Sequence, residues 1–215
     1  MRALLFDLDG VIIDSMPLHA EAWRTYLDRL GIACDDIDSR MYGHRNDEIV
    51  THIIGGDLNP ETIFAHGAAK EQLFREMMRA RLHALLVPGV VDFLESAHGF
   101  PMALVSNAET ANIDFVLDGT GLRRHFQVIV DGHQVDRPKP YPDIYLRAAE
   151  LLGVPAERCI IFEDSPTGIA AARASGARVV GVRTHPTDLG EVDLLIPDFR
   201  DPALKEWLES VERRT

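Results

Sequence analysis

Four short segments of the sequence combine acidic, hydroxyl and basic side chains that could work together in one site. Each comes directly after an apolar run or in the loop beyond one, although many residues separate them. Carboxylates, a hydroxyl group and an ammonium group are groups with which proteins hold metal ions and transferring phosphoryl groups. The segments are Asp7 to Gly10, Ser106 with Asn107, Arg137 to Pro140, and Glu163 to Ser165.

The charges of these segments do not balance. Asp7, Asp9, Glu163 and Asp164 place up to four negative charges near Lys139. Two unit charges about 4 Å apart repel by roughly 4 kcal/mol at an effective dielectric of about 20. Several such pairs would exceed what a marginally stable domain tolerates. A hard divalent cation with oxygen ligands resolves the repulsion, and we therefore expect Mg²⁺ at this place.

The elements that must position these side chains are short apolar runs followed by helical patterns. Runs without polar alternation are typical of strands buried on both faces of a parallel sheet. Their alternation with helices predicts an α/β fold, a Rossmann-like doubly wound parallel sheet. Ligands bind such sheets at the carboxyl ends of the strands, where the four segments fall. The runs are Ala3–Phe6, Met102–Val105, Val128–Val130, Cys159–Phe162, Val179–Val182 and Leu194–Ile196.

One stretch interrupts this alternation. Residues 15–87 contain helical patterns and no convincing strand, with a first helix from Ser15 to Gly31 and a longer one from Pro60 to Leu86. Pro17 at the start and Gly31 at the end are typical helix boundaries. We therefore predict a catalytic core of residues 1–14 and 88–215 with an inserted α-helical cap of residues 15–87.

In their order along the chain, the four segments resemble the signatures of the haloacid dehalogenase (HAD) superfamily of phosphohydrolases. The resemblance covers nearly the whole chain and implies a Mg²⁺-dependent phosphatase. Asp9 places the chain among the members that act on phosphate esters, because the dehalogenases lack this second Asp and the P-type ATPases have Lys there. The matching runs are Phe6-Asp7-Leu8-Asp9-Gly10, Val105-Ser106-Asn107, Lys139-Pro140-Tyr141-Pro142-Asp143 and Phe162-Glu163-Asp164-Ser165.

The resemblance also implies roles for the matching residues. Asp7 would attack phosphorus and form an aspartyl-phosphate, and Asp9 would act first as general acid and then as general base. Ser106 and Lys139 would hold the transferring phosphoryl oxygens, with Asn107 beside them. The metal ligands would be Asp7, the backbone carbonyl of Asp9, and Asp164, with Glu163 as a further ligand or behind them.

Three residues of the predicted cap are candidates for substrate contact. His19, Arg45 and Lys70 stand near the places where the β-phosphoglucomutase and phosphoglycolate phosphatase-like subfamily, which the chain resembles, has such residues. The match is loose, because His44 stands where the mutases usually have a small hydroxyl residue. The structural alternatives are a solvated charge for Lys70 and an interfacial residue for His19.

The core segments have structural alternatives too. Asp and Gly are common in turns, and Ser106-Asn107 or Glu163-Asp164 could cap the helices that follow. A lysine between prolines, as at position 139, is often simply solvated. Gly168, among several alanines, is typical of close packing between a helix and the sheet.

Composition limits the partners of the chain. Its 34 acidic and 22 basic residues give a net charge of -12, which disfavours nucleic acid and anionic membranes. The apolar run after Met1 is too short for a signal peptide or membrane span, so we expect a cytoplasmic protein. No heptad or large apolar stripe argues against a monomer. Two cysteines and nine histidines show no spacing typical of disulfide or zinc sites.

Three functions are compatible with these residues. The first is a phosphatase for a small phosphorylated metabolite, most simply a sugar phosphate. The second is a sugar phosphomutase of the β-phosphoglucomutase type, in which the phosphoryl group passes to a second hydroxyl instead of water. The third is a non-catalytic binding module on the same fold, which the presence of Asp7, Asp9, Lys139 and Asp164 disfavours.

Overall fold

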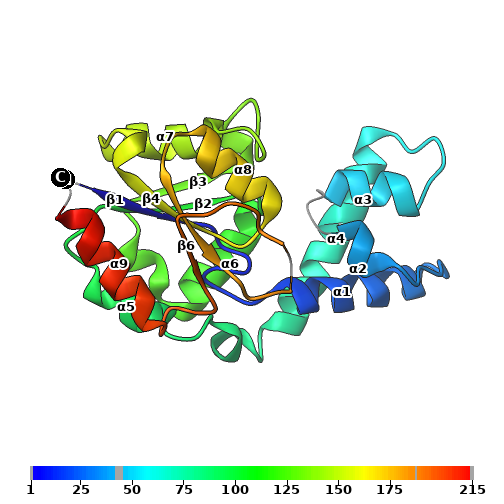
Figure 1. Cartoon of the computed structure of the whole chain (residues 1–215). Helices are drawn as coiled ribbons and strands as arrows, with labels where there is room; N and C mark the ends of the chain where they lie inside the picture. Colours follow the sequence, from blue (N-terminus) through cyan, green and yellow to red (C-terminus); the bar gives the residue numbers. More distant parts are fainter. Residues whose placement is uncertain (1, 42–45, 187, 214–215) are drawn as a thin grey trace. The chain divides into compact units, whose positions relative to one another are not determined.

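The computed structural model describes residues 2–41, 46–186 and 188–213, and the chain divides into two compact units. The core unit consists of Met1–Asp14 and Leu85–Thr215, and the inserted unit of Ser15–Ala84. The inserted unit is helical (Figure 1). Its helices are α1 (Met16–Arg29), α2 (Ile37–Met41), α3 (Asn46–Ile53) and α4 (Pro60–Met78).

The core unit is built on a six-stranded sheet in which all neighbouring strands are parallel. The strand order β3-β2-β1-β4-β5-β6 is that of a Rossmann-type doubly wound sheet, so the predicted fold class is confirmed. Strands β1 to β3 are added toward one edge of the sheet and β4 to β6 toward the other, so the strand order reverses between β1 and β4. Folds of this type bind ligands at that point. The strands are β1 (Ala3–Phe6), β2 (Met102–Ser106), β3 (Val128–Asp131), β4 (Cys159–Glu163), β5 (Arg178–Val182) and β6 (Leu194–Ile196).

Apolar side chains cover both faces of the sheet, as the unbroken apolar runs require. Leu5 and Ile161 pack in one buried cluster with residues of α7 and α8. On the other face the rings of Phe6 and Phe162 are stacked with centroids 4.7 Å apart, next to Phe93 of α5. Figure 1 shows helices on both sides of the strands. The core helices are α5 (Val90–Ser96), α6 (Thr110–Thr120), α7 (Asp143–Leu152), α8 (Pro166–Ala174) and α9 (Pro202–Glu212).

The two chain segments that join the units pair with each other inside the core unit. The Asp14 amide donates to the Leu85 carbonyl at 2.8 Å, and the Val87 amide donates to the Ile12 carbonyl at 3.0 Å. This pairing explains why the predicted helix from Pro60 to Leu86 is too long. Helix α4 ends at Met78 and a short 3-10 helix follows at Leu82–Leu85, because the residues beyond it must be extended to pair with residues 12–14.

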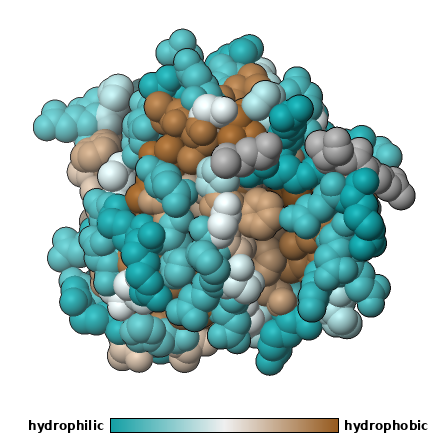
Figure 2. Space-filling view, turned by 90° about the vertical axis from the view of Figure 1, so that its left-hand side faces the viewer, coloured by the Kyte–Doolittle hydropathy of each residue, from teal (hydrophilic) through white to brown (hydrophobic). Residues whose placement is uncertain are grey.

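The face of the molecule drawn in Figure 2 is largely polar, in keeping with the acidic composition. Teal, hydrophilic side chains cover most of the face drawn in Figure 2, with smaller brown areas between them. No helix within the described ranges is long and apolar enough to cross a membrane. The large apolar side chains exposed on the described surface are Leu30, Phe64, Tyr141, Leu146, Leu151 and Leu195.

Candidate active site

The polar segments converge at the carboxyl edge of the sheet. Asp7 directly follows β1, and Ser106 and Glu163 are the last residues of β2 and β4. The parallel register sets Phe6 opposite Phe162, so β1 and β4 end at the same level. Asp7 and Glu163 therefore stand side by side at the point where the chain order reverses.

Lys139, from the loop between β3 and α7, lies between two of these carboxylates. Its ammonium group donates to Asp7 Oδ1 at 2.8 Å, to Glu163 Oε1 at 2.7 Å and to the Val105 carbonyl at 3.1 Å. The lysine side chain is only 4% exposed. The alternative of a solvated lysine is therefore wrong, and Lys139 is a fixed positive charge.

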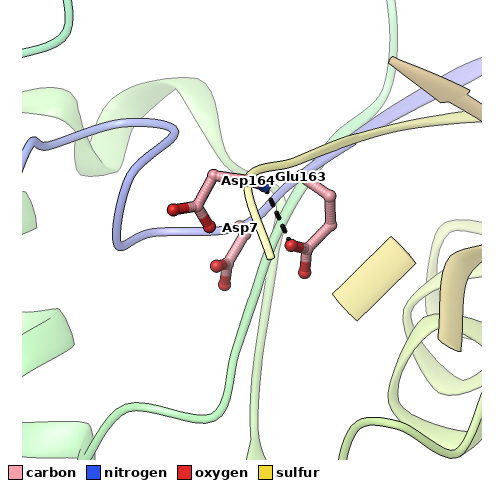
Figure 3. Close-up of side chains that lie close together, drawn as sticks. All are labelled: Asp7, Glu163 and Asp164. Carbon is pink, nitrogen blue, oxygen red and sulfur yellow. Dashed lines mark hydrogen bonds between the residues drawn. The ribbon is translucent and has the colours of Figure 1, made fainter. Parts of the chain in front are cut away.

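Asp7, Glu163 and Asp164 form a carboxylate cluster. One oxygen from each of them lies within 4.8 Å of the others. Figure 3 shows Asp164 beside Asp7, and its dashed line marks the hydrogen bond from the Asp164 amide to the Glu163 carboxylate. Asp9 is half-buried, and its carboxylate is not a member of this cluster as found among the described residues. The cluster can hold a metal ion through oxygen ligands.

Gly10 allows Asp164 to approach the loop after β1. Its φ of 75° is left-handed, and a Cβ at this position would overlap the Asp164 carboxylate. The Thr184 hydroxyl, from the loop after β5, donates to the Gly10 carbonyl at 3.0 Å. The Asp-x-Asp-Gly run is thus a turn, as one alternative proposed, and at the same time part of the carboxylate cluster.

Burial makes the ionised carboxylates unfavourable. It raises the pKa of Asp7 from 3.8 to about 7; Lys139 opposes this effect, whereas the charges of Glu163 and Asp9 add to it. Burial, with the charges of Glu163 and Asp7, also raises the pKa of Asp164 well above its ordinary value. Burial alone would lower the pKa of Lys139, but Asp7 and Glu163 raise it, so the ammonium form persists. One lysine does not balance these carboxylates, and the oxygen donors fit a hard divalent cation.

Ser106 and Asn107 lie beside Lys139 at the end of β2. The buried Ser106 hydroxyl accepts from the Ala108 amide at 3.1 Å. The Asn107 side chain exchanges two long hydrogen bonds of 3.4 Å with the backbone of Lys139. The N-cap of α6 is Glu109, so neither residue caps that helix. Asn107 instead holds the loop that carries the lysine.

The start of α8 also differs from the structural alternative. Ser165 is the N-cap of α8, and its hydroxyl accepts from the Gly168 amide at 3.0 Å. Glu163 and Asp164 therefore do not cap this helix. A Cβ on Gly168 would overlap the Glu163 carboxylate, so this glycine makes room for a site residue as well as packing the helix.

Sequence reasoning did not identify Tyr145 as part of the site. Its hydroxyl donates to Glu163 Oε1 at 2.7 Å, and the side chain is buried. A signal was present, because Tyr145 lies on the face of α7 that also buries Ile144, Ala148 and Ala149. A buried tyrosine hydroxyl on such a face needs a partner.

The cap candidates form a separate polar network within the inserted unit. The Lys70 ammonium donates to His19 Nδ1 at 2.7 Å and to Glu71 Oε1 at 2.8 Å. Asn46 donates to the same Glu71 oxygen at 2.6 Å. Lys70 is 1% exposed, so the alternative of a solvated charge is wrong. Arg45 lies outside the described residues.

Comparison with known proteins identifies the class that this fold and site define. The family model described as haloacid dehalogenase-like hydrolase matches residues 1–176. The chain therefore belongs to the haloacid dehalogenase-like hydrolase family, and the resemblance noted from the motifs is confirmed.

Individual relatives carry enzyme names. The chain is 37% identical over 183 residues to fructose-1-phosphate phosphatase YqaB of Escherichia coli, covering 84% of this chain and 95% of the relative. It is 34% identical over 215 residues to a beta-phosphoglucomutase of Mycobacterium bovis, covering 85% of this chain and 81% of the relative. A solved HAD hydrolase of family IA, variant 3, from Entamoeba histolytica has a TM-score of 0.87 at 26% identity, covering 99% of this chain and 100% of that one.

Proposed function

We propose that this protein is a Mg²⁺-dependent phosphatase that hydrolyses a small sugar phosphate through an aspartyl-phosphate on Asp7. The observation that carries the proposal is the contact of Asp7 with Lys139, next to Asp164, at the carboxyl edge of the sheet. This arrangement combines a buried nucleophile with positive charge for the transferring group, as phosphoryl transfer requires.

The proposed reaction has two stages. A carboxylate oxygen of Asp7 attacks phosphorus while the bond to the sugar oxygen breaks, and Asp9 donates its proton to that leaving oxygen. Asp9 then takes a proton from a water molecule, whose oxygen attacks phosphorus and releases inorganic phosphate and free Asp7. Lys139 and Ser106 hold the phosphoryl oxygens in both stages.

Asp7, the backbone carbonyl of Asp9, and Asp164 would hold the Mg²⁺ ion. When bound, Mg²⁺ supplies positive charge to the transferring phosphoryl group. Glu163 was predicted as a ligand or as a residue behind the ligands. The second role suits it better, since both of its oxygens already accept hydrogen bonds from the protein.

The substrate class rests on the relatives and on the inserted unit. The relatives named above include a phosphatase of a sugar phosphate and a mutase of a sugar phosphate. The proposed contacts to the sugar are His19, Lys70 and Arg45, of which the first two share a hydrogen bond.

A panel of phosphorylated sugars tests the proposal, with fructose 1-phosphate as the first member. We expect release of inorganic phosphate that requires Mg²⁺, stops with EDTA and falls at least a thousandfold in the Asp7→Asn variant, which lacks the nucleophile. Acid-quenched enzyme should carry phosphate on Asp7. Hydrolysis that survives Asp7→Asn would overturn the mechanism.

A phosphomutase is the second candidate, because a beta-phosphoglucomutase aligns with 85% of this chain. β-Glucose 1-phosphate with a trace of β-glucose 1,6-bisphosphate distinguishes the two activities. Formation of glucose 6-phosphate would establish the mutase. Release of inorganic phosphate alone would exclude it.

A further inference from the structure

The Glu163 carboxylate is held from all sides. It is completely buried, and five donors point at its two oxygens. Such a carboxylate has one position and one orientation, because each lone-pair direction is occupied. Oε1 accepts from Lys139 Nζ and the Tyr145 hydroxyl, each at 2.7 Å, and Oε2 accepts from the Asp164 amide at 3.0 Å and from the Ser165 amide and hydroxyl, each at 3.1 Å.

Tyr145 contacts both members of the Glu163–Lys139 ion pair. Its hydroxyl donates to the glutamate, and the Lys139 ammonium lies 5.1 Å from the centre of its ring. A ring face attracts a cation at this distance. The tyrosine is 1% exposed on α7, whose packing against the sheet fixes its position. Tyr145 thus restrains the lysine directly and through the glutamate.

Helix α8 also lies against the Glu163 carboxylate. Gly168 has no side chain, and a Cβ there would overlap the Glu163 carboxylate. The glutamate therefore lies between a tyrosine of one helix and the backbone of another. Movement of its carboxylate toward α8 is blocked, so the Tyr145 hydroxyl and Lys139 share Oε1 in a fixed geometry.

We propose that Tyr145 is a positioning residue for the phosphoryl transfer: by holding Glu163 Oε1 and the Lys139 ammonium, it aims Lys139 at Asp7. The inference rests on the proposed function. Tyr145 does not touch Asp7 in any hydrogen bond and acts through Lys139. Without the Tyr145 hydroxyl, Lys139 is the one remaining donor to Glu163 Oε1 among the described residues, and the glutamate draws the ammonium away from Asp7 and the phosphoryl oxygens.

Tyr145→Phe tests this role, because it removes the hydroxyl and keeps the ring. We expect kcat to fall about tenfold, the size of one hydrogen bond to a charged group. KM should stay within twofold, since Tyr145 acts through Lys139 on the transferring phosphoryl oxygens more than on the sugar. Tyr141→Phe is the matched control, with a half-exposed tyrosine from the same segment, and should leave both constants unchanged.

A double-mutant cycle with Glu163→Gln separates positioning from general stability. If Tyr145 acts through Glu163, adding Tyr145→Phe to Glu163→Gln should change kcat by less than twofold. This comparison also serves if Tyr145→Phe alone is too unstable to assay. A further tenfold loss in the double variant, or a kcat unchanged in an active Tyr145→Phe enzyme, would overturn the inference alone. A wild-type protein inactive on every substrate would overturn the proposed function and this inference with it.

Discussion

The Asp7 carboxylate accepts a hydrogen bond from Lys139, while the carboxylates of Glu163 and Asp164 lie close by. At an effective dielectric of about 20, two carboxylates about 5 Å apart repel by roughly 3 kcal/mol. Lys139 offsets part of this repulsion through its two ion pairs. The ionised Asp7 carboxylate therefore destabilises the fold unless a further cation is bound, which is a cost often found at functional sites.

The shifted pKa of Asp7 predicts a pH-dependent stability in EDTA. Its pKa is raised from 3.8 to about 7, so between about pH 4 and pH 7 the folded protein retains a proton that the unfolded chain releases. Because the unfolded state binds fewer protons in this window, stability falls as pH rises through it. Relative to Asp7→Asn, the wild type should lose on the order of a few kcal/mol from pH 4 to pH 8.

Urea unfolding of both proteins across this pH range provides the measurement. Excess Mg²⁺ is the control, because a bound cation favours the ionised carboxylate and should flatten the difference at high pH. Parallel stability curves for wild type and Asp7→Asn in EDTA would contradict the assignment of a raised pKa to this group.

At the scale of elements, two glycines let separate segments approach the site closely. Gly10 brings the loop after β1 against Asp164, and Gly168 brings α8 against Glu163. In both places a single methyl group would meet a carboxylate. The geometry of the site therefore depends on how closely α8 and the loop after β1 approach the end of β4.

Gly168→Ala should displace Glu163 from Lys139 and Tyr145. We expect kcat to fall tenfold or more, and the free energy of unfolding to drop by about 1–3 kcal/mol through overpacking. Gly99→Ala is the matched control, since no heavy atom lies within 4 Å of its added Cβ. The free energy of unfolding of Gly99→Ala should stay within about 0.5 kcal/mol of the wild-type value. A Gly168→Ala enzyme with normal kcat would show that Glu163 tolerates displacement.

The strands were predictable because each contains a short apolar run, and the central ones are buried on both faces, such as Cys159–Glu163, whose five residues are all buried. The end of α4 could not be predicted from the sequence, because it depends on the backbone pairing of residues 85–87 with residues 12–14, which are far away along the chain. The motif residues Asp7 and Lys139 stood out by type and spacing. Tyr145 did not, since its role depends on a hydrogen bond to Glu163, 18 residues away along the chain.

At the scale of the whole molecule, the two units carry separate polar clusters in an acidic chain of net charge -12. Each cluster contains one buried lysine paired with a buried glutamate: Lys139 with Glu163 in the core unit, and Lys70 with Glu71 in the inserted unit. Replacing one member of a buried ion pair by an uncharged residue lowers the free energy of unfolding, because the other member keeps an unpaired buried charge.

Lys70→Met should destabilise the inserted unit by about 3 kcal/mol, because Glu71, which accepts from Asn46, would keep a buried charge without the lysine. Urea unfolding followed by tryptophan fluorescence measures this, since Trp23 lies next to Lys70 in the same unit. The double variant Lys70→Met/Glu71→Gln is the control and should recover more than half of the loss. Equal stability of the single and double variants would contradict this account.

The two chain segments that join the units make the molecule modular, because they pair with each other. The inserted unit leaves the core at Asp14 and returns at Leu85, and these two residues share a hydrogen bond, as do Ile12 and Val87. The insertion therefore begins and ends at neighbouring points of one small ladder, as a loop does at the tip of a hairpin. Such a connection tolerates inserts of very different length at little entropic cost, so the inserted unit can vary while the sheet and its carboxylate cluster stay unchanged.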